Sequence, residues 1–254
     1  MNRLFALYRT TPGKKLIVAV SGILMLGFLI GHIAGNLKVF LPEVNGTPDI
    51  DIYAEYLREI GVPLLPHTFV LWVARVVLLA ALVLHVTCVI QLSAHNRSAR
   101  QVDYRQRHFA QATPPARWMM YSGLYLLGFV ILHLLQFTFG VVSQYEPGAV
   151  YDNLQAAFSH LPWAVLYVIS MVVIGLHLYH GAWSLFQTVG LDNPDRNRGL
   201  RRGAAVLAVG LAILFSSIPV AFLTGVLKAR SGAVVDENRP AVVSSGNATG
   251  EDQP

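Results

Sequence analysis

Charged residues are scarce in this sequence. Asp, Glu, Lys and Arg together make up 13% of the 254 residues, whereas 54% are hydrophobic. Ordinary soluble domains carry about 25% charged residues, and here the charges are missing from long stretches instead of being thinned evenly. The composition therefore predicts an integral membrane protein and excludes one or two ordinary soluble domains.

Cysteine is almost absent, since Cys88 is the only one. A single cysteine excludes an internal disulfide and any iron–sulfur or zinc site that needs four cysteines from this chain. The formal net charge of +5 does not indicate a nucleic-acid partner, because the Lys and Arg residues gather in short clusters at the ends of apolar segments. That distribution is typical of membrane topology.

Five apolar segments are each long enough to cross about 30 Å of hydrocarbon at about 1.5 Å per residue. We therefore expect an all-α, membrane-embedded bundle of five transmembrane helices within residues 1–228. Residues 49–60 suggest a short surface helix, and the polar tail 229–254 is expected to be disordered. The predicted spans are 16–40, 68–93, 118–143, 162–189 and 203–227.

The loops alternate in charge. The N-terminal segment and the second and fourth loops are rich in Lys and Arg, whereas the first loop holds five acidic residues against Arg58 and the third holds Glu146 and Asp152 without any Lys or Arg. The positive-inside rule then predicts a cytoplasmic N-terminus and an outer C-terminus in the cytoplasmic membrane.

Histidine recurs inside four successive spans, at His32, His85, His133, and both His177 and His180. A polar ring within hydrocarbon needs a hydrogen bond, a cavity or a metal, so each is a candidate functional residue. One such histidine could be a packing residue, but four helices that repeat it favour a shared role. Depth along the helices predicts an outer pair, His32 with His133, and an inner pair of His85 with His177 or His180.

Paired imidazoles from facing helices can ligate the iron of a haem on both sides, which leaves no open position and suits electron transfer. Zinc and di-iron sites in a bundle normally recruit Cys, Asp or Glu, and a Rieske-type cluster needs two cysteines, yet the spans contain no Asp or Glu, and Cys88 is alone. Two b-type haems are therefore the expected cofactors. Gly31 and Gly35 flank His32, and Gly181 follows His177 by one turn, where small residues would admit a flat ligand or a neighbouring helix.

Arg75 is the one charge deep within a span. It would lie in the outer part of the second helix, where it could pair with a haem propionate or extend to the lipid headgroups. Both alternatives stay open at the level of sequence.

Two segments carry a family resemblance. Residues 21–36 read SGILMLGFLIGHIAGN and residues 177–190 read HLYHGAWSLFQTVG, and both are similar to segments of the cytochrome b subunit of succinate dehydrogenase and fumarate reductase, in its single-polypeptide, five-helix, di-haem form. The similarity extends from about Lys14 to Leu227.

The resemblance implies specific ligands. His32 and His133 would bind the haem farther from the catalytic subunits, and His85 and His177 the nearer one. Depth slightly favours His180 over His177, but the spacing to the glycine and aromatic residue that follow favours His177. His180 then stays a candidate for a propionate or quinone contact.

The resemblance also implies a function in electron transport. The chain would anchor a flavoprotein and an iron–sulfur subunit on the cytoplasmic side, as part of complex II of the tricarboxylic acid cycle. It would pass electrons between them and a membrane quinone, menaquinone or ubiquinone, while the dehydrogenase active site lies in the partner subunits. Two alternatives are a di-haem cytochrome b of a formate dehydrogenase or hydrogenase, and a non-redox membrane anchor or transporter.

Overall fold

The structure is a computed structural model that describes residues 8–98, 114–143, 145–188, 190 and 197–228. The predicted tail 229–254 and most of the basic residues of the second loop lie outside the described residues. Within the described ranges the regular structure is helical, as the sequence predicts.

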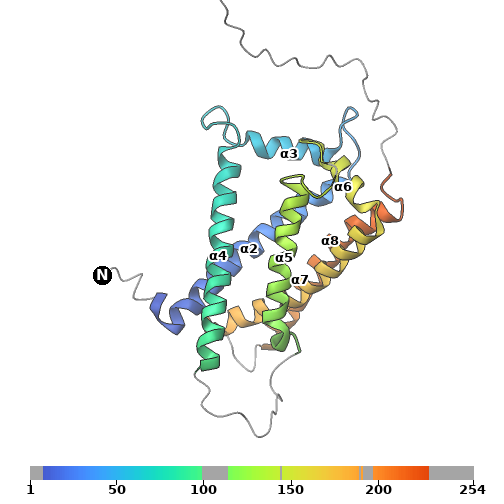
Figure 1. Cartoon of the computed structure of the whole chain (residues 1–254). Coiled ribbons are helices and arrows are strands. Elements are labelled where there is room, and N and C mark those ends of the chain that lie inside the picture. The colour runs from blue at the N-terminus through green and yellow to red at the C-terminus, as the bar shows by residue number, and fades with distance from the viewer. Residues whose placement is uncertain (1–7, 99–113, 144, 189, 191–196, 229–254) are drawn as a thin grey trace, which may run out of the picture.

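Five long helices are apolar enough to cross a membrane, which confirms the predicted fold class and makes the chain a multi-pass membrane protein. Their order along the chain is easy to follow in Figure 1. They are α2 (Thr11–Asn36), which continues through the 3-10 turn η1 (Leu37–Phe40), α4 (Phe69–Ser98), α5 (Pro114–Phe137), α7 (Leu161–Thr188) and α8 (Asn197–Leu223).

Two helices end earlier than the apolar runs suggest, because a glycine takes a backbone conformation that a helix cannot. Helix α5 ends at Phe137, before residue 143, and Gly140 follows it with φ of 65°. Helix α8 ends at Leu223, before residue 227, and Gly225 follows it with φ of 74°. Left-handed glycines are common where helices stop.

The outward faces of the long helices are apolar. Leu124 on α5 is 68% exposed and Val206 on α8 is 74% exposed, and many other large apolar side chains on these helices are exposed as well. Exposure of so much apolar surface to water would be unfavourable. In a bilayer, these side chains face lipid tails, and most backbone groups of each helix are satisfied within that helix.

The bundle is built from closely packed helix pairs. Helix α2 packs along α4, α5 along α7, and α7 along α8. Figure 1 shows α4 as a separate rod on the side away from α8, and among the described residues α4 has no comparable packing against α5 or α7. The four histidine-bearing helices are therefore arranged as two pairs, α2 with α4 and α5 with α7.

One end of the bundle is covered by two short helices, α3 (Asp49–Glu59) and α6 (Val150–Phe158). Helix α3 confirms the predicted surface helix. Lys38 pairs with Asp49 at 2.6 Å, and the backbone N–H of Tyr151 donates to Asp51 at 2.9 Å, so α3 is held to both η1 and α6.

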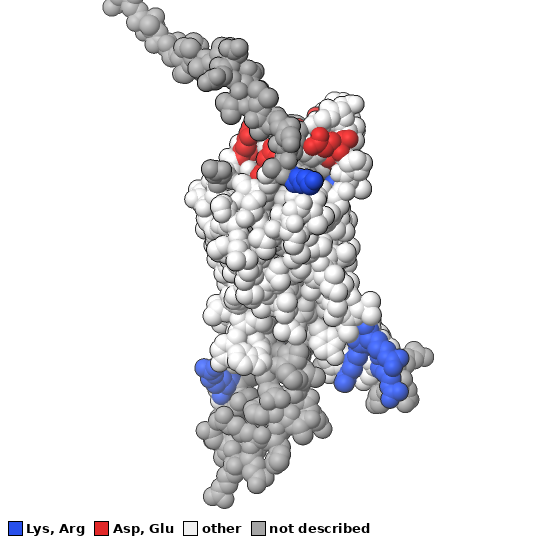
Figure 2. All heavy atoms as spheres, turned by 90° about the vertical axis from the view of Figure 1, so that its right-hand side faces the viewer, with Lys and Arg blue, Asp and Glu red and all other residues white. Residues whose placement is uncertain are grey.

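Charges segregate between the two ends. Figure 2 shows acidic side chains gathered at one end of the molecule and Lys and Arg side chains mainly at the other. The acidic end carries Asp49, Asp51 and Glu55 of α3. This separation agrees with the alternating charge of the loops, while the direction of the chain across a particular membrane stays a prediction.

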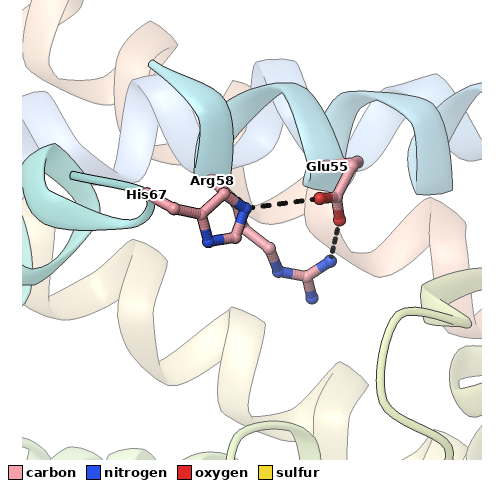
Figure 3. Close-up of polar contacts among 3 residues, drawn as sticks. All are labelled: Glu55, Arg58 and His67. Carbon is pink, nitrogen blue, oxygen red and sulfur yellow. Dashed lines mark hydrogen bonds and ion pairs between the residues drawn. The ribbon is translucent and has the colours of Figure 1, made fainter. Parts of the chain in front are cut away.

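Helix α3 also contacts the segment just before α4 through an exposed polar group, drawn in Figure 3. Arg58 donates to Glu55 at 2.6 Å, and His67 lies 3.6 Å from the other carboxylate oxygen. The Arg58 guanidinium, with a smaller contribution from His67, holds the pKa of Glu55 below its ordinary value. Exposed ion pairs of this kind contribute little to stability.

Candidate cofactor site

The two predicted outer histidines lie together in the structure. The ring of His32 on α2 and the ring of His133 on α5 have centroids 6.0 Å apart, with their planes nearly perpendicular at 85°. Imidazoles on opposite sides of one metal ion, each bonded at about 2 Å, have centroids roughly 6 Å apart. The spacing of these two rings fits a shared iron.

Aromatic side chains surround the outer pair. Phe28 stacks on His32 at 5.1 Å, and Phe215 of α8 lies 5.9 Å from the same ring. Phe129 and Phe137 lie 6.1 and 5.5 Å from His133. The histidines are thus the polar groups of a mostly aromatic environment that suits a large, flat, apolar macrocycle.

His133 is also connected to a buried polar chain. Its Nδ1 lies 3.3 Å from the hydroxyl of Tyr167 on α7, and that hydroxyl donates to Oε1 of Gln136 at 2.8 Å. Gln136 is completely buried, and its Nε2 has no hydrogen-bond partner among the described residues. A buried N–H donor without an acceptor is costly, and a propionate oxygen is the kind of group that would satisfy it.

His85 on α4 is held from α2. The Nδ1 atom of His85 lies 3.1 Å from the hydroxyl of Ser21. A Cβ placed on Gly22 would lie 3.6 Å from Cε1 of the same ring, so the imidazole rests against the backbone of α2 at this glycine.

His177 on α7 is held from α5 in the same way. Its Nδ1 lies 3.1 Å from the hydroxyl of Ser122, and a Cβ on Gly123 would lie 3.5 Å from Cε1. His177 is also near enough to His85 for an electrostatic interaction between the two rings. The predicted inner histidines thus belong to one region between the two helix pairs.

The remaining candidates are placed differently. His180 is half-buried one turn beyond His177, and no hydrogen bond joins its ring to the described residues. Arg75 is exposed on α4, and its guanidinium lies 5.0 Å from the ring centroid of Trp72. That position favours contact with lipid headgroups over a propionate. Cys88 is fully buried.

The glycines next to the histidines have separate roles. Gly31 and its surroundings are open, with nothing within 4 Å of an added Cβ. Gly35 makes room for α3, since a Cβ there would lie 2.5 Å from Tyr53. Gly181 faces Met119 at 3.9 Å.

Sequence reasoning did not identify Ser21, Ser122, Tyr167 or Gln136. One signal was available, because the dipeptide Ser-Gly occurs at 21–22 and again at 122–123, in the first and third spans. Comparisons with family models, curated proteins and solved structures found no match to this chain.

Proposed function

We propose that this chain is the di-haem cytochrome b membrane-anchor subunit of a succinate:quinone oxidoreductase. In this proposal His32 and His133 hold the outer haem, and His85 and His177 hold the inner one. When bound, a haem with two histidine ligands supplies one-electron transfer and has no open position for oxygen chemistry.

The observation that carries the proposal is the arrangement of the histidines. His32 and His133, on two different transmembrane helices, have ring centroids 6.0 Å apart, a spacing that would allow both rings to bind one iron, and histidine also recurs in the two helices packed against theirs. The completely buried Gln136, with its unpaired amide N–H, adds a polar group suited to the edge of a macrocycle.

The protein's own contribution is to position these ligands and keep water away. Phe28, Phe129 and Phe215 line the outer pair, and apolar surroundings of this kind influence the reduction potential of an iron site. The basic end of the bundle offers a docking surface for acidic surfaces of a flavoprotein and an iron–sulfur subunit on the cytoplasmic side of the cytoplasmic membrane. Those partners, and menaquinone or ubiquinone as the electron acceptor, follow from the resemblance of residues 21–36 and 177–190.

The test is an optical spectrum of the full-length protein purified from a haem-producing host. Reduced-minus-oxidised difference spectra are expected to show two b-type components. His85→Ala and His177→Ala each remove one component, and His32→Ala and His133→Ala each remove the other. His180→Ala is the matched control on the same helix as His177 and leaves both in place.

Two results would contradict the proposal at different levels. A wild-type protein without any b-type band would exclude the cytochrome function altogether. Loss of a component in His180→Ala but not in His177→Ala would overturn the fourth-helix ligand alone. Co-purification of a flavoprotein and an iron–sulfur subunit with succinate dehydrogenase activity separates the proposed complex from a formate dehydrogenase or hydrogenase.

A further inference from the structure

The same serine–histidine unit occurs twice in the bundle. Ser21 on α2 meets His85 on α4, and Ser122 on α5 meets His177 on α7, with Oγ to Nδ1 distances of 3.1 Å in both cases. In each unit the serine belongs to the neighbouring helix of the packed pair. Two separate helix pairs therefore make the same contact with a histidine.

Each serine hydroxyl also forms a hydrogen bond to the backbone of its own helix. The Ser21 hydroxyl donates to the backbone carbonyl of Ile17 at 2.7 Å, and the Ser122 hydroxyl donates to that of Met119 at 3.0 Å. A hydroxyl has one proton, so an oxygen that donates to its own helix can only accept from the ring.

With the hydroxyl proton on the backbone carbonyl, each serine oxygen accepts from a histidine whose ring proton is on Nδ1. The other nitrogen, Nε2, then carries a free lone pair and is turned away from the serine. Metal-binding histidines usually show this arrangement, in which the second ring nitrogen donates to a fixed acceptor that sets the tautomer and the ring direction.

The outer histidines lack this unit. His133 meets the hydroxyl of Tyr167 at the longer distance of 3.3 Å, and the ring of His32 is positioned by stacking on Phe28. Among the described residues the serine contact is thus made by His85 and His177 and not by the outer histidines.

We infer that Ser21 and Ser122 are positioning residues that hold His85 and His177 as Nδ1-protonated rings with Nε2 directed to the inner cofactor. This inference rests on the proposed function, but the tautomers themselves belong to the protein without cofactor. They can therefore be measured separately.

The first experiment uses full-length, haem-free protein in detergent with ¹⁵N-labelled histidine. Ring-nitrogen chemical shifts report which nitrogen carries the proton, and His→Gln variants assign the signals. His85 and His177 are expected to be neutral with the proton on Nδ1. Ser122→Ala moves the His177 signals toward the other tautomer and leaves His85 unchanged, Ser21→Ala does the reverse, and Ser122→Thr restores the wild-type pattern.

Ser170→Ala is the matched control. Ser170 is fully buried, donates to the carbonyl of Leu166 at 2.8 Å, and meets Tyr125 on α5 at 2.9 Å, so it makes the same kind of interhelical contact without a histidine. This variant is expected to leave both tautomers unchanged. A wild-type His177 protonated on Nε2, or a Ser122→Ala protein with an unchanged tautomer, overturns the inference.

The second experiment titrates haemin into the same proteins and follows each b-type component. Loss of the group that hydrogen-bonds to a metal-binding histidine typically lowers metal affinity about 10- to 100-fold, so Ser21→Ala and Ser122→Ala lower the haem affinity of the inner site by that factor. Both variants also raise the midpoint potential of the inner component, because a less basic imidazole stabilises ferric iron less. The outer component does not change. If the wild type binds haem and both serine variants bind it equally well, the positioning role is wrong while the proposed function stands. If the wild type binds no haem, the proposed function fails, and the tautomer measurement still decides the role of the serines.

Discussion

The polar chain from His133 through Tyr167 to Gln136 makes a prediction about stability that does not depend on any cofactor. Tyr167→Phe removes one hydroxyl and keeps the ring, which packs against Phe129 at 5.0 Å and Phe158 at 4.9 Å. The substitution therefore isolates the two polar contacts, at 2.8 Å to Gln136 and 3.3 Å to His133.

The size of the effect follows from the two hydrogen bonds that the substitution removes. Hydrogen bonds between transmembrane helices contribute about 0.6 kcal/mol on average and up to about 1.7 kcal/mol. Two such bonds on one hydroxyl give an expected loss of about 1 kcal/mol, and about 3 kcal/mol at the upper limit. We expect a stability loss toward the upper end of that range, because Gln136 is fully buried and its amide N–H already lacks a partner among the described residues.

A double-mutant cycle with Gln136→Leu measures the hydrogen bond itself, by unfolding in mixed detergent and SDS micelles followed by circular dichroism. Tyr167→Phe alone leaves the side-chain carbonyl of Gln136 without its hydrogen bond, and in the double variant with Gln136→Leu that carbonyl is absent. The double variant should therefore lose less stability than the sum of the losses in the two single variants. The expected coupling is about 0.5 kcal/mol or more. Tyr121→Phe, on a side chain that is 67% exposed, is the control and should have no effect. Additive losses in the cycle would refute the buried hydrogen bond.

Two further predictions concern the end of the bundle covered by α3. Gly35→Ala places a Cβ 2.5 Å from Tyr53, so it should displace α3 and lower stability by about 1–3 kcal/mol. Gly31→Ala, with open space around it, is the control and should not. Thermal unfolding compares the two variants, and equal unfolding midpoints for both would contradict the contact between Gly35 and Tyr53. The pKa of Glu55 lies below its ordinary value because of Arg58, so its small contribution to stability is present above the ordinary carboxyl pKa and is lost as the pH falls through the lowered value. Carboxyl NMR titration should show that pKa return upward in Arg58→Ala, and an unchanged titration would exclude Arg58 as the cause.

The number of transmembrane helices could be predicted because it depends on a local property. A run of apolar residues long enough to cross the bilayer forms a helix whatever its neighbours are, since the backbone has no other way to satisfy its hydrogen bonds in lipid. The ends of those helices were less predictable. Residues 138–143 are apolar enough to continue α5, but Gly140 stops the helix through its backbone conformation.

The candidate site was predictable only in its most conspicuous residues. Histidine within an apolar span is rare enough to be noticed one residue at a time, which is why His32, His85, His133 and His177 could be named from the sequence. Serine in a transmembrane helix is common and usually bonds to its own backbone. Ser21 and Ser122 do this too, so apart from the glycine that follows each of them nothing in the one-dimensional pattern distinguishes them from Ser170.

By itself, the sequence determined that the chain has five segments long and apolar enough to cross a membrane and that four of them carry histidine, because length, hydropathy and position along a helix are all counted along the chain. The tertiary structure decided what those histidines touch. Whether His85 meets Ser21, or His133 meets Tyr167, depends on the rotation and relative height of separate helices. Those quantities are set by the packing of whole helix surfaces against one another and are not carried by any short segment.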